Sequence, residues 1–163
     1  MRGNKVALFI EGMQCTLCGK EILSKQGVIG FAPLIANSLD PLYIFHDGTF
    51  HTACFYRHPL AHQMQKRVDE WEQETKEWPP SCAICNSVIN NPDEYFTFGH
   101  LTDDPTSPLH VYNYKQYHLS CLKGWQELSL VLAQLKELED SHCWGGLVLQ
   151  SLIVNIDKLM LIL

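Results

Sequence analysis

The stretch YHLSCLKGW, residues 117–125, places His118 and Cys121 three positions apart and ends at Trp125. Residues three apart lie on one face of a helix, so an imidazole and a thiol at these positions could bind one ion together. Because a structural metal site needs four donors, the stretch is complete only if two more donors lie elsewhere in the chain. Otherwise Cys121 is an ordinary buried cysteine in an amphipathic turn.

The missing donors occur within an internal repeat. Cys82 and Cys85 precede His118 and Cys121 in the pattern C-x2-C-x32-H-x2-C, and Cys15 begins an identical pattern 67 residues earlier. Apolar and aromatic residues recur at the same offset: Ile22/Ile89, Leu34/Leu101, Leu42/Leu109, Ile44/Val111, Phe45/Tyr112 and Phe50/Tyr117. A shared offset without gaps indicates two copies of one structural unit in tandem.

Each pattern supplies three cysteines and one histidine, which are donor types that bind zinc tetrahedrally. A C-x2-C turn brings two thiolates to one point, and H-x2-C at the start of a helix adds the other two donors. With no open position for water, such a site is structural, and we predict two structural zinc ions. The identical spacing favours sequential sites, with sites crossed between the repeats as the alternative. The predicted ligands are Cys15, Cys18, His51 and Cys54 in the first repeat, and Cys82, Cys85, His118 and Cys121 in the second.

Composition limits the remaining possibilities. The chain has 163 residues, 46% of them hydrophobic, so it can bury the core of one domain or of two small ones. A net charge of -6 and a pI near 5.7 disfavour a surface that binds nucleic-acid phosphates. Seven cysteines without a recognisable signal peptide predict an intracellular, cytoplasmic protein, or a nuclear one in a eukaryote. The apolar C-terminal stretch is interrupted by Gln150, Asn155 and Asp157, so no transmembrane helix is predicted.

The two patterns resemble the treble-clef group of zinc modules, in which a C-x2-C knuckle, a β-hairpin and a helix supply the ligands. CTLCGKEI with DGTFHTACF resembles half of a LIM domain, and CAIC with YHLSCLKGW resembles part of a RING finger. The resemblance covers residues 15–57 and 82–125. A full RING has a second set of four ligands, but Asn113 and Lys115 stand where two of them would be expected, so the RING is incomplete.

The predicted fold class is α+β, with two tandem treble-clef-like modules and additional helices. Residues 1–57 form the first module, 58–80 a connecting helix that Pro79 ends, 81–125 the second module and 126–163 two amphipathic helices. Leu128, Val131, Leu132, Leu135 and Leu138 define the first of these helices by their spacing, and Gly145-Gly146 is expected to break it. The two apolar stripes predict an antiparallel helical hairpin, which packs on the second module or dimerises.

Closed zinc sites perform no chemistry, so the leading hypothesis is a zinc-stabilised adaptor that binds a protein partner. The RING resemblance implies an alternative, a ubiquitin-ligase-type adaptor that recruits a conjugating enzyme through Ile84, Leu122 and Trp125. A nucleic-acid-binding or HNH-like nuclease protein is a third possibility, for which His46 is a candidate residue. Cys143, the seventh cysteine, is interpreted as a buried structural thiol.

Overall fold

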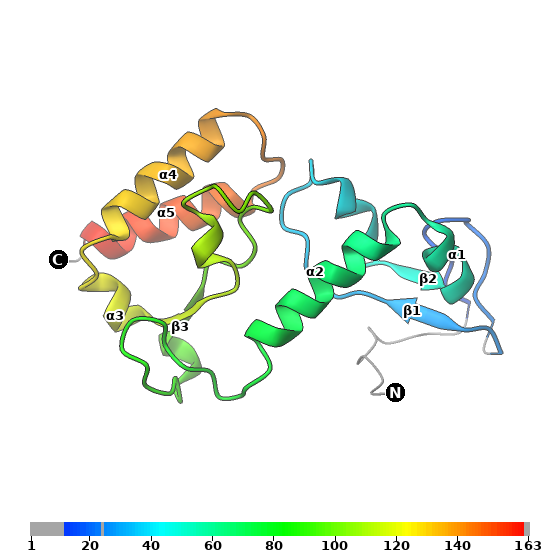
Figure 1. The fold of residues 1–163 in the computed structure, drawn as a ribbon, viewed down its shortest axis with the longest axis horizontal. Helices are drawn as coiled ribbons and strands as arrows, with labels where there is room; N and C mark the ends of the chain where they lie inside the picture. Colours follow the sequence, from blue (N-terminus) through cyan, green and yellow to red (C-terminus); the bar gives the residue numbers. More distant parts are fainter. Residues whose placement is uncertain (1–11, 24, 162–163) are drawn as a thin grey trace. The chain divides into compact units, whose positions relative to one another are not determined.

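The computed structural model describes residues 12–23 and 25–161, which form a mixed α/β structure of small antiparallel hairpins and helices (Figure 1). The chain divides into two compact units, each with its own hydrophobic core. The first unit comprises Met1–Ile35 and Asp40–Asp69, and the second comprises Ala36–Leu39 and Glu70–Leu163. None of the helices in the described ranges is long and apolar enough to cross a membrane.

The first unit is built around a short hairpin and an aromatic core. Its elements are β1 (Val28–Gly30), the 3-10 helix η1 (Pro41–Phe45), β2 (Thr49–His51), α1 (Thr52–Arg57) and most of α2 (Ala61–Glu74). β1 pairs antiparallel with β2. Phe45, Phe50 and Phe55 are fully buried, with ring centroids 5.4 Å apart for Phe45 and Phe55 and 5.6 Å apart for Phe45 and Phe50. Edge-to-face packing of aromatic rings buries a large apolar area with few residues, and it stabilises this small core.

The second unit repeats this order and has two additional helices, a short 3-10 helix before its first strand and an α-helix at its end. It contains η2 (Pro92–Glu94), β3 (Tyr95–Thr97), η3 (His110–Tyr112), β4 (Gln116–His118), α3 (Leu119–Lys123), α4 (Leu128–Asp140) and α5 (Val148–Leu161). Its core joins Tyr117 and Leu122 to the apolar faces of α4 and α5.

Backbone geometry repeats with the sequence. The pairs Val28–His51 and Tyr95–His118 have the same place in their hairpins, and 67 residues separate the two pairs. Left-handed residues recur at the same offset as well: Gly19 (φ 68) with Asn86 (φ 59), and Asp47 (φ 49) with Tyr114 (φ 58). Asp47 and Gly48 lie between η1 and β2.

The long helices α2 and α4 also begin at equivalent positions, Ala61 and Leu128. The structural repeat therefore extends beyond the metal motif and includes a long helix in each copy. α2 ends at Glu74, before the proline pair that was expected to stop it. The Glu74 carbonyl accepts a hydrogen bond of 3.1 Å from the side-chain amide of the buried Gln116 on β4. This amide takes the place of the backbone N–H that a further helical turn would have supplied.

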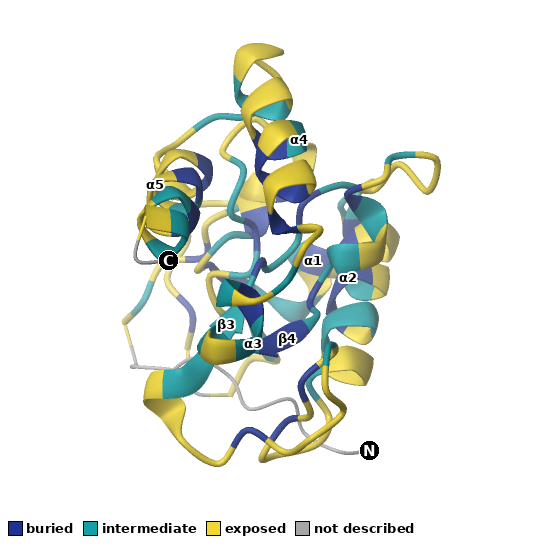
Figure 2. Ribbon diagram, turned by 90° about the vertical axis from the view of Figure 1, so that its left-hand side faces the viewer, coloured by how far each residue is buried: buried dark blue, intermediate teal, exposed yellow. Residues whose placement is uncertain are grey.

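α4 and α5 lie side by side as an antiparallel hairpin, as predicted from their apolar stripes. Figure 2 shows buried residues next to exposed ones along both helices. Lys136 of α4 and Asp157 of α5 form an ion pair of 3.1 Å at the surface of this hairpin.

α4 ends at Asp140 rather than at the glycine pair, because His142 adopts a left-handed conformation with φ 55. Gly145 has a different role: a Cβ there would collide with the side chain of Ser38.

A buried ion pair joins two elements of the first unit. The Oδ1 atom of Asp40 accepts a hydrogen bond from the Leu42 N–H at 2.8 Å and so caps η1. Its Oδ2 atom lies 3.3 Å from the Nη1 atom of Arg67 on α2, whose side chain is 2% exposed. In the second repeat the equivalent of Asp40 is Ser107, whose hydroxyl accepts a hydrogen bond of 3.3 Å from the Leu109 N–H but does not cap η3, since the N-cap of that helix is Leu109.

We expect Asp40→Ala to destabilise the first unit more than Ser107→Ala destabilises the second. The first change removes a cap and also the carboxylate beside a buried guanidinium, which costs about 3 kcal/mol or more when a buried pair is broken. The second change removes only one side-chain hydrogen bond of a turn, worth about 1 kcal/mol. Urea unfolding followed by residue-resolved NMR measures both, and equal losses would show that the Asp40–Arg67 contact adds nothing.

Candidate metal centres

Two groups of side chains converge in the structure, one in each repeat. Cys15, Cys18, His51 and Cys54 form the first, and Cys82, Cys85, His118 and Cys121 form the second. The ligand atoms within each group lie within 4.8 Å of one another. Each group comes from a single repeat, so the arrangement is sequential rather than crossed. Two Cys3His clusters that could hold metal ions are therefore present.

A tight turn brings the first two thiols of each cluster together. The Cys15 N–H donates to the Lys20 carbonyl at 2.8 Å, and the Gly19 N–H donates back to the Cys15 carbonyl at 2.8 Å. Gly19 is left-handed, which costs glycine little. In the second repeat Asn86 takes this position, and asparagine tolerates the left-handed region better than most residues do.

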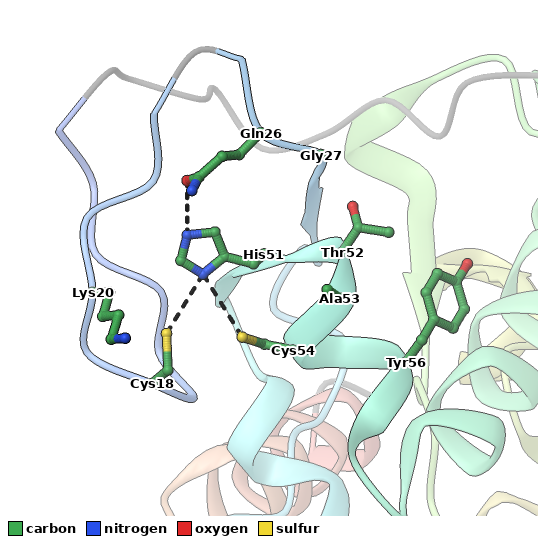
Figure 3. A pocket seen from close by; sticks show the side chains of 9 residues that line it. All are labelled: Cys18, Lys20, Gln26, Gly27, His51, Thr52, Ala53, Cys54 and Tyr56. Atoms are coloured by element: carbon green, nitrogen blue, oxygen red, sulfur yellow. Dashed lines mark hydrogen bonds between the residues drawn. The ribbon is translucent and has the colours of Figure 1, made fainter.

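The junction between strand and helix supplies the other two donors. His51 is the last residue of β2 and Cys54 lies in the first turn of α1, so both side chains point to the turn described above. The Nδ1 atom of His51 lies 3.5 Å from the Sγ atom of Cys18 and 3.7 Å from that of Cys54 (Figure 3). The corresponding distances from His118 are 3.5 Å to Cys85 and 3.8 Å to Cys121.

Gln26 orients the imidazole of the first cluster, and sequence analysis did not identify it. The Nε2 atom of His51 lies 2.9 Å from the Oε1 atom of Gln26, which also accepts the Leu23 N–H at 2.9 Å (Figure 3). An imidazole that donates through Nε2 presents the lone pair of Nδ1 to the sulfurs, which is the form that binds a metal. No spacing rule links Gln26 to His51, because only the pairing of β1 with β2 brings them together.

The thiols within each cluster differ in their acidity. Burial raises the pKa of Cys15, but backbone hydrogen bonds from His51, Cys18 and Leu17 outweigh it and lower that pKa to about 6. Hydrogen bonds, first from the Ser87 backbone, lower the pKa of Cys85 to about 6. Desolvation, followed by interactions with the neighbouring thiols, raises the pKa of Cys54 to about 11 and that of Cys121 to about 12. Three thiolates in one cluster would repel one another, and a dication would allow all three thiols to ionise together.

The donor set fits zinc. Three sulfurs and one imidazole nitrogen complete a tetrahedron, and Cys3His is one of the combinations used by structural zinc sites. The first thiol of each cluster, that of Cys15 or Cys82, is buried, and the second, that of Cys18 or Cys85, is exposed. Each cluster therefore lies at the edge of the core of its repeat. An ion held in this way would fix the turn, the hairpin and the helix of one repeat to one point.

The remaining predicted residues lie outside the clusters. Leu122 is fully buried, whereas Ile84 and Trp125 pack partly buried against the same core. Of these three residues, only Ile84 and Trp125 expose surface to a partner. Cys143 was expected to be buried but is exposed. His46 stacks on Tyr43 with centroids 4.8 Å apart and belongs to neither cluster.

Comparison with known proteins gives no match: no family model fits the sequence, and neither a curated protein nor a solved structure is similar to the chain. The structure itself therefore defines the class, a duplicated α/β protein with two Cys3His clusters.

We expect the purified chain to contain two zinc ions, and Cys54→Ser or Cys121→Ser to lose one each. Loss of one ion should unfold its own repeat, because each set of donors comes from a single repeat. Mass spectrometry of metal content and NMR amide spectra measure the two effects, and Cys143→Ser is the matched control that should retain both ions. A variant that keeps two ions after either ligand substitution would contradict the assignment.

Proposed function

We propose that this chain is a zinc-stabilised adaptor that binds a protein partner inside the cell. The observation that carries the proposal is the closed donor set of each cluster, in which all four ligand atoms are protein side chains within 4.8 Å. A metal with four protein ligands has no position for a substrate or an activated water, so its contribution is to folding. The part that the two repeats share, a knuckle with a hairpin and a helix, supports a treble-clef-like module.

Exposed apolar residues support a protein partner. On the first unit these include Tyr43, Ile44 and Tyr56, and on the second Trp78 and Val111, the last two with 75% and 63% of their surface exposed. Three thiolates around one dication add about one negative charge per site to a chain that already carries a net charge of -6. Such a surface repels nucleic-acid phosphates and leaves apolar contacts as the main source of affinity.

The C-terminal hairpin offers a second apolar surface. Three leucines of this hairpin are exposed: Leu130 of α4 by 57%, Leu147 just before α5 by 74% and Leu161 at the end of α5 by 84%. Self-association through these helices would cover them.

Affinity capture from native extract tests the adaptor role. We expect the zinc-loaded chain and Cys143→Ser to retain the same partner, and Cys54→Ser or Cys121→Ser to lose it, because each ligand change unfolds a binding surface. Quantitative mass spectrometry of the captured proteins reads this out. If the same proteins bind equally to the zinc-free chain, the metal does not support a binding surface and the proposal fails.

A conjugating enzyme is a second candidate partner, favoured by the placement of Ile84 and Trp125. Both residues pack against the core cluster that contains Leu122 while keeping part of their surface exposed. An apolar patch beside a knuckle and a short helix is what the RING resemblance implies for recruiting such an enzyme.

Single-turnover discharge of a thioester-linked modifier distinguishes this candidate. Stimulation by the wild-type chain should disappear in the Ile84→Ala/Trp125→Ala variant, because the patch loses its apolar atoms. Equal rates with and without the wild-type chain would remove the candidate and leave the general adaptor role in place.

A further inference from the structure

The outer ring nitrogen of the cluster histidine has different surroundings in the two repeats. The Nε2 atom of His51 lies 2.9 Å from the Oε1 atom of Gln26 and 3.3 Å from the carbonyl oxygen of Glu21. Figure 3 shows the Gln26 contact. His118 is the equivalent residue, and its side-chain contacts with the other ligands are made by Nδ1. Within residues 12–23 and 25–161, no protein group hydrogen-bonds to the Nε2 atom of His118.

The local backbone explains this difference. Gln26 lies in a bend just before β1, and its Oε1 atom also accepts the Leu23 N–H at 2.9 Å. The equivalent residue of the second repeat is Asp93, which lies in the additional 3-10 helix η2. Its backbone N–H donates to the side chain of Asn91 at 3.0 Å. The second repeat therefore has a shorter side chain on a different turn, and its carboxylate does not contact the imidazole.

The donor atoms of the two clusters, by contrast, match closely. The distances from Nδ1 to the second and third thiols are 3.5 and 3.7 Å in the first cluster, and 3.5 and 3.8 Å in the second. The backbone N–H of the histidine donates to the first thiol at 3.4 Å in one cluster and at 3.3 Å in the other. The pattern of burial is also the same. A difference in metal affinity between the sites would therefore come from the atoms around the donors.

An acceptor at the outer nitrogen prepares an imidazole for a metal. It fixes the tautomer and the orientation of the ring, and it makes the ligating nitrogen more basic. An imidazole without such a partner loses its freedom to rotate only when the metal binds, and this loss opposes binding. Removal of an outer partner typically lowers metal affinity about 10–100-fold. Because Gln26 is exposed, we expect an effect at the lower end, about tenfold.

We propose that Gln26 is a positioning residue that makes the first site the tighter of the two, so that the second repeat releases its zinc first. The inference rests on the zinc sites and the adaptor function proposed above, and it names how that function is regulated. Ile84 and Trp125 pack against the core of the second unit. The surface that they form would thus respond to a fall in free zinc that leaves the first repeat loaded.

Chelator titration of the zinc-loaded full chain tests the order of release. A chelator of known zinc affinity sets the free zinc concentration, and the amide resonances of the buried equivalents Phe50 and Tyr117 report on the two repeats. The Tyr117 resonance should disappear at a free zinc concentration about tenfold higher than the Phe50 resonance does. Equal midpoints, or earlier loss of the Phe50 resonance, would overturn the proposal.

Three variants test whether Gln26 is the cause. Gln26→Leu should raise the midpoint of the first site about tenfold, whereas Gln26→Glu should not, because a carboxylate keeps the acceptor. Asp93→Leu is the matched control and should leave the second site unchanged. The units also differ in the size of their cores, so each variant is compared with the same site of the wild-type chain. An unchanged first site in Gln26→Leu, or an equal effect of Asp93→Leu on the second site, would contradict the assignment.

Nitrogen-15 spectra of the histidine rings separate positioning from a general effect on the turn. In the zinc-loaded chain the Nε2–H proton of His51 should exchange slowly with water, and that of His118 rapidly. Gln26→Leu should make the His51 proton exchange rapidly, and Gln26→Glu should keep it slow. Rapid exchange at His51 in the wild-type chain would show that Gln26 does not hold the ring and would overturn the proposal.

Partner capture at set zinc concentrations separates this inference from the adaptor role. Different midpoints with no partner captured at any zinc concentration would support the order of release and remove the adaptor. Coincident midpoints with zinc-dependent capture would keep the adaptor and overturn the role of Gln26. A chain that binds no zinc would overturn both.

Discussion

The convergence of three sulfurs and one imidazole within each repeat is the constraint on which the structure depends. Each repeat has only three-residue strands and a small core, so its turn, hairpin and short helix need a common anchor. The cluster supplies it, because its four donors come from the turn, from the end of the second strand and from the first helical turn. A bound cation of charge +2 would also reduce the electrostatic repulsion among the three thiolates.

The two copies keep this anchor and differ in what they build around it. On α4, Leu132 is buried and Lys136 pairs with Asp157 of α5. The equivalent residues of α2 are Gln65 and Asp69, which hydrogen-bond to each other at 3.0 Å. An apolar position at Leu132 thus permits a covering helix on the second copy, whereas the polar pair keeps that face of α2 suited to solvent.

A similar divergence shapes the surroundings of the metal clusters. The second copy satisfies the first turn of α3 with its own Glu94, and the first copy has Gly27 at that position. A pocket lies beside the first cluster, and Gly27 is among the residues that line it.

The sequence by itself determined the eight metal donors, their division into two repeats and the amphipathic helices, because all of these follow from short-range spacing and period. It did not predict the Asp40–Arg67 pair, the Gln26–His51 contact or the Glu94 cap. Each of those joins residues 25 or more positions apart that no periodic pattern relates. Only the tertiary structure decided them, because the path of the backbone sets which distant side chains can reach one another.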